Sequence, residues 1–201
     1  MNARFAINPI ADLVATTLLP PDRQTAAVAN LGIADRSDTQ RHGCKGPGAA
    51  TWLTALGLPI PARPNQWLPL DEDGRVVRLG TSEFLIEGPI AQLTTVATTP
   101  RGPGVYPVLH QDAAFVLTGA HLNELLRQTC SLNFRSLAWM ERPMVLTSMA
   151  GVNVIALQEP HVPHPVLRIW CDGTFGHYLW NTLLDIALSY GGGAVAATRI
   201  D

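Results

Sequence analysis

Apolar residues near the centre of the chain change from a strand-like to a helix-like period at a single glycine. Residues 114–118 form a mostly apolar run of strand length, and Gly119 follows them directly. Beyond the glycine, apolar side chains recur at helical spacing, at Leu122, Leu125, Leu126 and Cys130. The stretch 43–56 repeats this design, with a predicted helix over residues 48–56 that ends at Gly57. The two stretches predict two similar strand–glycine–helix halves.

Short apolar runs predict strands in both halves, at residues 33–37, 75–79, 83–87, 144–149, 151–157 and 166–171. The acidic turn at 71–74 joins two apolar runs, which is typical of a hairpin. The proline- and glycine-rich loop at 100–104 is the clearest internal break. We therefore expect subdomains at 1–100 and 101–201, packed as one compact unit. The order of strands and helices predicts an α+β fold with antiparallel or mixed sheets and a few packed helices.

The last predicted helix, over residues 174–190, has a wide apolar surface. At 100° per residue its apolar side chains cover about 220°, whereas the stripe of an ordinary surface helix is roughly 100–140° wide. We expect burial on two sides, against the sheet and against either another helix of this chain or a different chain. Trp180, Leu184 and Leu188, with Trp170 on the preceding strand, are therefore candidate contacts for a partner.

Charged residues make up only 15% of the 201 residues, and hydrophobic residues make up 47%. About 25% charged is usual for soluble domains, so the shortage of charge favours a surface partly covered by a partner subunit. The net charge of −2, without a basic cluster, argues against nucleic-acid binding. No apolar run reaches the roughly 18 residues of a membrane-spanning helix, and the first residues do not resemble a signal peptide. Three widely spaced cysteines (Cys44, Cys130, Cys171) indicate reduced thiols in a cytoplasmic protein.

No motif in the sequence assembles a catalytic group or a metal site. His161 and His164 flank a proline, but zinc needs three or four ligands and no other Cys or His is near in sequence. His42 and Cys44 share a strand face without a recognisable base, which is more typical of a core thiol than of a nucleophile. The turn at 46–48 precedes a helix as a phosphate loop does, but its lysine precedes the glycines, which favours tight packing instead.

Blocks along most of the chain resemble the folate-binding aminomethyltransferase superfamily, at residues 33–37, 46–53 and 79–85. Later blocks are similar more narrowly to the gamma subunit of heterotetrameric sarcosine oxidase and to the small subunit of N-methylglutamate dehydrogenase. These blocks are residues 129–134, 146–152 and 167–180. The last block, with its Trp-Cys-Asp-Gly-Thr-Phe-Gly-His-Tyr run, is the most specific of them.

The resemblance implies a four-subunit flavoenzyme of one-carbon metabolism that oxidatively demethylates an N-methyl amino acid. It implies FAD, FMN, NAD and tetrahydrofolate for the whole complex, and none of them for this chain. The chain would be the accessory, non-catalytic gamma subunit, with an aminomethyltransferase-like fold and with alpha-, beta- and delta-type subunits as partners.

Two carboxylates are candidates for a residual folate site. Asp35 lies in a matching block but fits a strand edge equally well, and Asp172 follows the last strand where a helix N-cap is expected. Two alternatives to an accessory subunit therefore stay open. One is a small tetrahydrofolate-dependent aminomethyltransferase-like protein, and the other is an assembly factor of the same fold.

Overall fold

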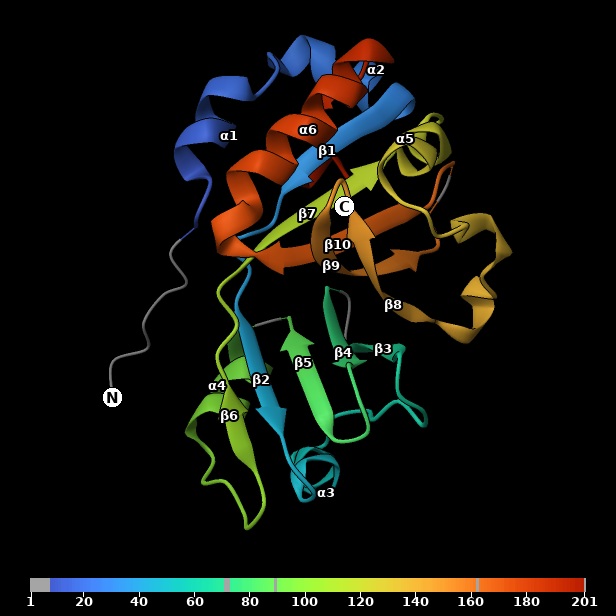
Figure 1. Ribbon diagram of the computed structural model, residues 1–201. Helices are drawn as coiled ribbons and strands as arrows, with labels where there is room; N and C mark the ends of the chain where they lie inside the picture. The colour runs from blue at the N-terminus through green and yellow to red at the C-terminus, as the bar shows by residue number, and fades with distance from the viewer. Residues whose placement is uncertain (1–7, 71–72, 89, 162, 201) are drawn as a thin grey trace. The chain divides into compact units, whose positions relative to one another are not determined.

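The computed structural model describes residues 8–70, 73–88, 90–161 and 163–200, and these residues form two compact units. Within the described residues, unit 1 comprises 39–110 and 140–144. Unit 2 comprises 8–38, 111–139 and 145–200. Each unit contains its own sheet and its own helices (Figure 1).

Unit 1 is built on a five-stranded sheet of order β3-β4-β5-β2-β6. Its strands are β2 (Arg41–Lys45), β3 (Gln66–Leu70), β4 (Gly74–Arg78), β5 (Glu83–Glu87) and β6 (Tyr106–Val108). All neighbouring strands run antiparallel, and β3 with β4 forms the predicted hairpin. The helices α3 (Ala49–Ala55) and α4 (Ile90–Thr98) share an apolar core with one face of this sheet. That core includes Cys44, Trp52, Leu53, Phe84, Ile86 and Leu93.

Unit 2 is built on a six-stranded sheet of order β11-β1-β7-β10-β9-β8. Its strands are β1 (Gly32–Asp35), β7 (Asp112–Thr118), β8 (Met144–Met149), β9 (Val152–Glu159), β10 (Val166–Asp172) and β11 (Gly193–Ala194). The pair β1–β11 is parallel, whereas β1–β7, β7–β10 and β9–β10 are antiparallel. One antiparallel and one mixed sheet with packed helices confirm the predicted α+β class.

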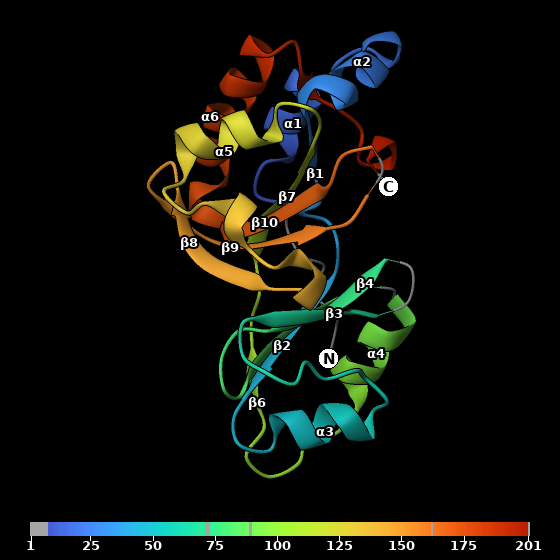
Figure 2. The same ribbon diagram turned by 90° about the vertical axis from the view of Figure 1, so that its right-hand side faces the viewer.

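Helices cover both faces of the sheet in unit 2. The helices α1 (Ala11–Thr17), α5 (Leu122–Thr129) and α6 (Gly176–Ser189) lie on one face, and Figure 2 shows α5 beside α6. The other face carries α2 (Pro21–Leu31) and the 3-10 turn η4 (Ala197–Arg199), through a small apolar cluster. Three further 3-10 turns are η1 (Phe134–Ser136), η2 (Trp139–Glu141) and η3 (Gly173–Phe175).

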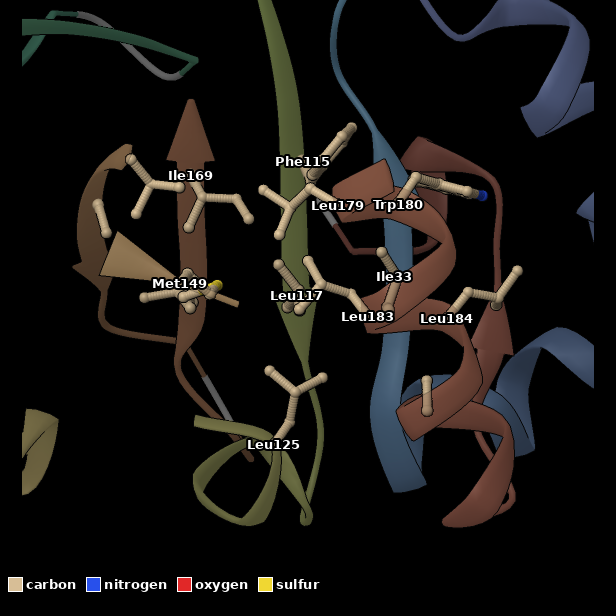
Figure 3. Close-up of a cluster of buried hydrophobic side chains, with 14 of the residues drawn as sticks. Ile33, Phe115, Leu117, Leu125, Met149, Ile169, Leu179, Trp180, Leu183 and Leu184 are labelled. Atoms are coloured by element: carbon tan, nitrogen blue, oxygen red, sulfur yellow. The ribbon is translucent and has the colours of Figure 1, made fainter. Parts of the chain in front are cut away.

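The main core of unit 2 follows the predicted alternation of its strands. Leu167, Ile169 and Cys171 of β10 share one face, as predicted, and lie in one core cluster with residues of α5 and α6. Figure 3 shows Ile169 and Met149 in this cluster. Trp180 of α6 is fully buried and meets Phe115 edge-on, with ring centroids 5.4 Å apart. Aromatic pairs prefer this geometry, which adds about 0.5–1.5 kcal/mol to the burial of the rings.

The apolar face of α6 is only partly buried. Its buried residues span about 140° of the helix, and they are Gly176, Leu179, Trp180, Leu183, Leu184 and Ala187. Helices of the same chain flank this stripe: the indole N–H of Trp180 donates to Thr17 of α1, and Gln128 of α5 donates to the Tyr190 hydroxyl. The rest of the predicted 220° arc includes Phe175 and Leu188, which are both about half exposed.

The two units divide the chain differently from a boundary at residues 100–104. Residues 8–38 belong to unit 2 because β1 pairs along its length with β7. The loop at 100–104 lies inside unit 1, where the Gly104 carbonyl accepts a hydrogen bond from the amide of Gly48. Helix α4 and the short strand β6 lie in regions where the sequence pattern predicts no element.

Candidate functional site

A cavity of about 620 Å³ lies in unit 2, where one end of β7, β8, β9 and β10 meets. These four strands are successive neighbours in the sheet. The start of β7, the end of β10 and the turn between β8 and β9 therefore lie at the same end of the sheet. The lining residues are Asp112, Leu146, Thr147, Ser148, Asn153, Val154, Ile155, Trp170, Cys171 and Asp172. The cavity thus combines an apolar wall with a rim of hydroxyls, an amide and carboxylates.

Strand register brings two carboxylates to the rim of this cavity. Asp172, at the end of β10, pairs with Asp112, at the start of β7. The sequence predicts a turn residue and helix N-cap at Asp172. In the structure Asp172 caps the 3-10 turn η3, which precedes α6: its Oδ1 accepts hydrogen bonds from the amide (2.9 Å) and hydroxyl (2.7 Å) of Thr174. Both bonds lower the pKa of Asp172, and the bond from the hydroxyl has the larger effect. The carboxylate is therefore ionised at neutral pH.

Cys171 also lines the cavity, but it cannot serve as a nucleophile there. Burial raises the pKa of its thiol to about 12, and the negative charges of Asp112 and Asp172 add to this effect. Nucleophilic attack requires the thiolate. The thiol therefore stays neutral and acts as a core side chain.

The lining does not match the phosphate-bearing cofactors that the resemblance implies for the complex. FAD, FMN and NAD carry phosphates, and proteins bind phosphates through cations, backbone amides or helix N-termini. Lysine, arginine and histidine are all missing from the described lining of this cavity, and two carboxylates are present. A folate ring has N–H donors that a carboxylate can accept, but its glutamate carboxylates would find no cation here. The cavity thus offers no cation to the phosphates of FAD, FMN and NAD or to the glutamate of a folate, and only the folate ring would find a partner in its carboxylates.

Asp35, the other folate candidate, has a structural role. Its Oδ2 accepts from Asn8 at 2.6 Å, and its Oδ1 accepts from the amide and hydroxyl of Ser37. The Ser37 hydroxyl in turn accepts from the amide of Ala114. Asp35 therefore fixes the end of β1 on β7. It is not brought together with Asp172, because β7 lies between β1 and β10.

The remaining sequence candidates in unit 1 also have structural explanations. Burial raises the pKa of Cys44 to about 11, although the charge of Arg101 opposes this shift. Burial also lowers the pKa of His42, and the positive charge of Arg101 lowers it further. The turn at 46–48 uses its amides internally, since Gly46 donates to Ser82 and Gly48 donates to Gly104. A Cβ on Gly48 would lie 2.4 Å from a carbonyl oxygen, so the glycine permits close packing, as predicted.

The four candidate contacts for a partner differ in accessibility. Trp170, Trp180 and Leu184 are buried within the chain, whereas Leu188 is about half exposed. Apolar side chains that sequence reasoning missed are also exposed, and these include Tyr106, Leu109, Met140, Leu146 and Tyr178. No sequence signal distinguished these residues, because isolated apolar residues in strands and turns resemble core positions.

Searches for metal clusters and membrane spans concern only the described residues. Among these residues, no three histidine, cysteine, aspartate or glutamate side chains are grouped so that they could hold a metal ion. In the same part of the chain, every helix is too short or too polar to cross a membrane.

Comparison with solved structures identifies proteins of similar fold. One chain of heterotetrameric sarcosine oxidase from Corynebacterium sp. U-96, solved with pyrrole 2-carboxylate, matches with a TM-score of 0.72 and 21% identity. The match covers 92% of this chain and 96% of that one. Glycine cleavage system aminomethyltransferase T from Bartonella henselae matches with a TM-score of 0.68 and 16% identity, over 93% of this chain and 58% of the enzyme. No family model and no curated protein matches the sequence. The fold is therefore aminomethyltransferase-like.

Proposed function

We propose that this chain is an accessory, non-catalytic subunit of a sarcosine-oxidase-like complex, corresponding to the gamma type. The observation that carries the proposal is the match along 96% of one chain of a heterotetrameric sarcosine oxidase. The complex would oxidatively demethylate an N-methyl amino acid in the cytoplasm. Its FAD, FMN, NAD and tetrahydrofolate would be held by alpha-, beta- and delta-type partner subunits.

The chemistry of the chain supports an accessory role. Burial raises the pKa values of the Cys44 and Cys171 thiols, which keeps both neutral. The cavity lining in unit 2 contains carboxylates and offers no cation to a phosphate. Low charge content and half-exposed apolar residues on and beside α6, such as Phe175, Tyr178 and Leu188, suit a surface that a partner covers.

Co-expression with alpha-, beta- and delta-type subunits of a sarcosine-oxidase-like enzyme tests this proposal. We expect the chain to co-elute with them at a fixed ratio in size exclusion, in a yellow complex that oxidises an N-methyl amino acid. Association at a substoichiometric, variable ratio would instead support an assembly factor. A chain that stays monomeric and gains no stability from these partners would contradict the proposal.

A second candidate is a small tetrahydrofolate-dependent aminomethyltransferase-like protein. The observation that favours it is the ionised Asp172 carboxylate at the cavity rim, which could accept the N–H groups of a folate ring. This candidate predicts calorimetric heat when tetrahydrofolate is added to the isolated chain, and a loss of that heat in Asp172→Asn. Asp35→Asn is the matched comparison, because Asp35 lies outside this lining. No heat at millimolar tetrahydrofolate would remove the candidate.

A further inference from the structure

A second cavity of unit 2, of about 450 Å³, is lined by one continuous part of the chain. Its walls are the outer side of α5 and the turn that leads into η1. The lining residues are Asn123, Leu126, Arg127, Cys130, Ser131, Leu132, Asn133, Phe134 and Arg135. The floor is apolar, the rim carries amides, a hydroxyl and two guanidinium groups, and the described lining contains no carboxylate.

The turn that holds Arg135 is fixed by the core of unit 2. Phe134 is buried and stacks on Trp139, whose indole N–H donates to the Phe134 carbonyl at 2.9 Å. The side chain of Asn133 accepts from the amide of Arg135. At the other end of the turn, the thiol of Cys130 lies 3.4 Å from the Thr147 hydroxyl. The cavity wall is therefore a well-anchored turn.

The two arginines of this cavity lack the glutamate partners that several other arginines of the chain have. Arg41, Arg75 and Arg168 each form an ion pair with a glutamate. In contrast, the guanidinium groups of Arg127 and Arg135 make no hydrogen bond or ion pair within the described part of the chain.

The acidic residue of α5, Glu124, forms no ion pair with either arginine. Glu124 precedes Arg127 by nearly one helical turn, yet its buried Oε2 has no hydrogen-bond partner among the described residues. Among the described residues, neither guanidinium at the cavity rim is therefore in an ion pair with a carboxylate.

We propose that this cavity binds a small organic anion, whose carboxylate or phosphate group pairs with Arg127 and Arg135 and whose apolar part rests on Leu126, Leu132 and Phe134. Guanidinium groups bind both anions through paired, charge-assisted hydrogen bonds. The volume suits a small ligand, since ligand pockets range from roughly 300 to 1,000 Å³. The site is separate from the cavity at the β7–β10 edge, because the two linings share no residue.

An NMR titration of the ¹⁵N-labelled full chain tests this site. The probes are benzoate and phenyl phosphate, which distinguish the two anionic groups, and benzamide, which has the same ring without a charge. We expect at least one anion to shift amide signals within residues 123–135, and benzamide to shift them far less. Added salt should weaken the binding, because the contacts at the rim are exposed.

Single substitutions test whether each of the two arginines contributes to anion binding. Arg127→Gln and Arg135→Gln should each weaken anion binding by roughly tenfold or more, because each removes a charge-assisted contact. Arg23→Gln is the matched control, since Arg23 is an exposed arginine on α2, outside this lining. Benzamide binding as tightly as the better-binding anion would overturn the proposal. So would unchanged affinity for that anion in both cavity variants, or an absence of shifts with both anions.

Discussion

The substitution Glu87→Gln removes the shared carboxylate of a buried row of charges in unit 1. Strand register places Arg41 of β2 and Arg75 of β4 on either side of Glu87 on β5. The Nε of Arg41 donates to Glu87 Oε2 at 2.6 Å, and Nη1 of Arg75 donates to Oε1. All three side chains are at most 3% exposed. The Glu87 carboxylate therefore pairs with two buried cations at once.

The structure sets the expected loss. Breaking a buried ion pair by removing one partner costs about 3–5 kcal/mol, because the remaining charge stays buried without compensation. A glutamine at this position retains one acceptor oxygen for one of the two arginines. Its NH₂ group would face the second guanidinium, so two hydrogen-bond donors would meet without an acceptor. We therefore expect Glu87→Gln to lower the free energy of unfolding of unit 1 by about 4 kcal/mol, a large share of the 5–15 kcal/mol typical of native proteins.

Native-state hydrogen exchange of amides in β2, β4 and β5 measures this loss for unit 1 directly. The matched control is Glu141→Gln, which breaks the exposed Arg63–Glu141 pair, where N and O are 3.0 Å apart and the side chains are 69% and 63% exposed. An exposed pair contributes about 0–1 kcal/mol, so the control should stay close to the parent chain. If both variants lost less than about 1 kcal/mol, the reasoning that the buried row stabilises unit 1 would be refuted.

Three further predictions concern packing, thiols and the N-cap. Gly48→Ala should lower the melting temperature, because its Cβ would lie 2.4 Å from a carbonyl oxygen, whereas Gly102→Ala, with nothing within 4 Å, should not. Burial raises the pKa of Cys44 from 9.0 to about 11 and that of Cys171 to about 12. As the pH rises, these thiols ionise at lower pH in the unfolded chain than in the folded one, so the free energy of unfolding measured in urea should fall between pH 9 and 11. Thiol reagents at pH 8 should react with Cys44 and Cys171 only after unfolding. Asp172→Ala should speed hydrogen exchange of the Thr174 amide in η3, the turn that precedes α6. Because hydrogen bonds lower the pKa of Asp172, the difference from the parent should vanish at low pH, where that carboxyl is protonated.

Elements with a strong period could be predicted from the sequence. The apolar positions of α5 match the observed burial. In β10 the face of Leu167, Ile169 and Cys171 lies in the core as the alternation indicates, but Trp170 on the other face is buried as well. Helix α4 was missed, since its run of threonine and valine has low intrinsic helix propensity and the helix depends on the burial of Leu93 and Val96. Strand β6 was missed because it is a three-residue edge strand that contains Pro107.

The candidate sites depend on long-range pairing, which a local pattern does not reveal. Asp172 was recognised as a capping residue, but its partner at the cavity rim, Asp112, was not. The two meet only because β7 and β10 pair in one register, across sixty positions of sequence. The arginine cavity depends on the turn after α5, where the buried Phe134 anchors the chain next to Arg135. Sequence spacing alone places Arg127 and Arg135 apart.

The chain itself buries only part of the wide apolar arc of α6. Helices α1 and α5 of the same chain flank the buried stripe, so part of the predicted second covering is internal. Phe175 and Leu188 nevertheless stay about half exposed on opposite borders of that stripe. Each fully buried large apolar side chain contributes about 1.5–3 kcal/mol, so covering them would favour association. If α6 meets a partner subunit, Leu188→Asp should weaken co-elution with the sarcosine-oxidase-type subunits and leave the melting temperature of the isolated chain nearly unchanged. Asp185→Asn, at an exposed site on the same helix, is the control. Undiminished assembly of Leu188→Asp would move the partner contact away from this end of α6.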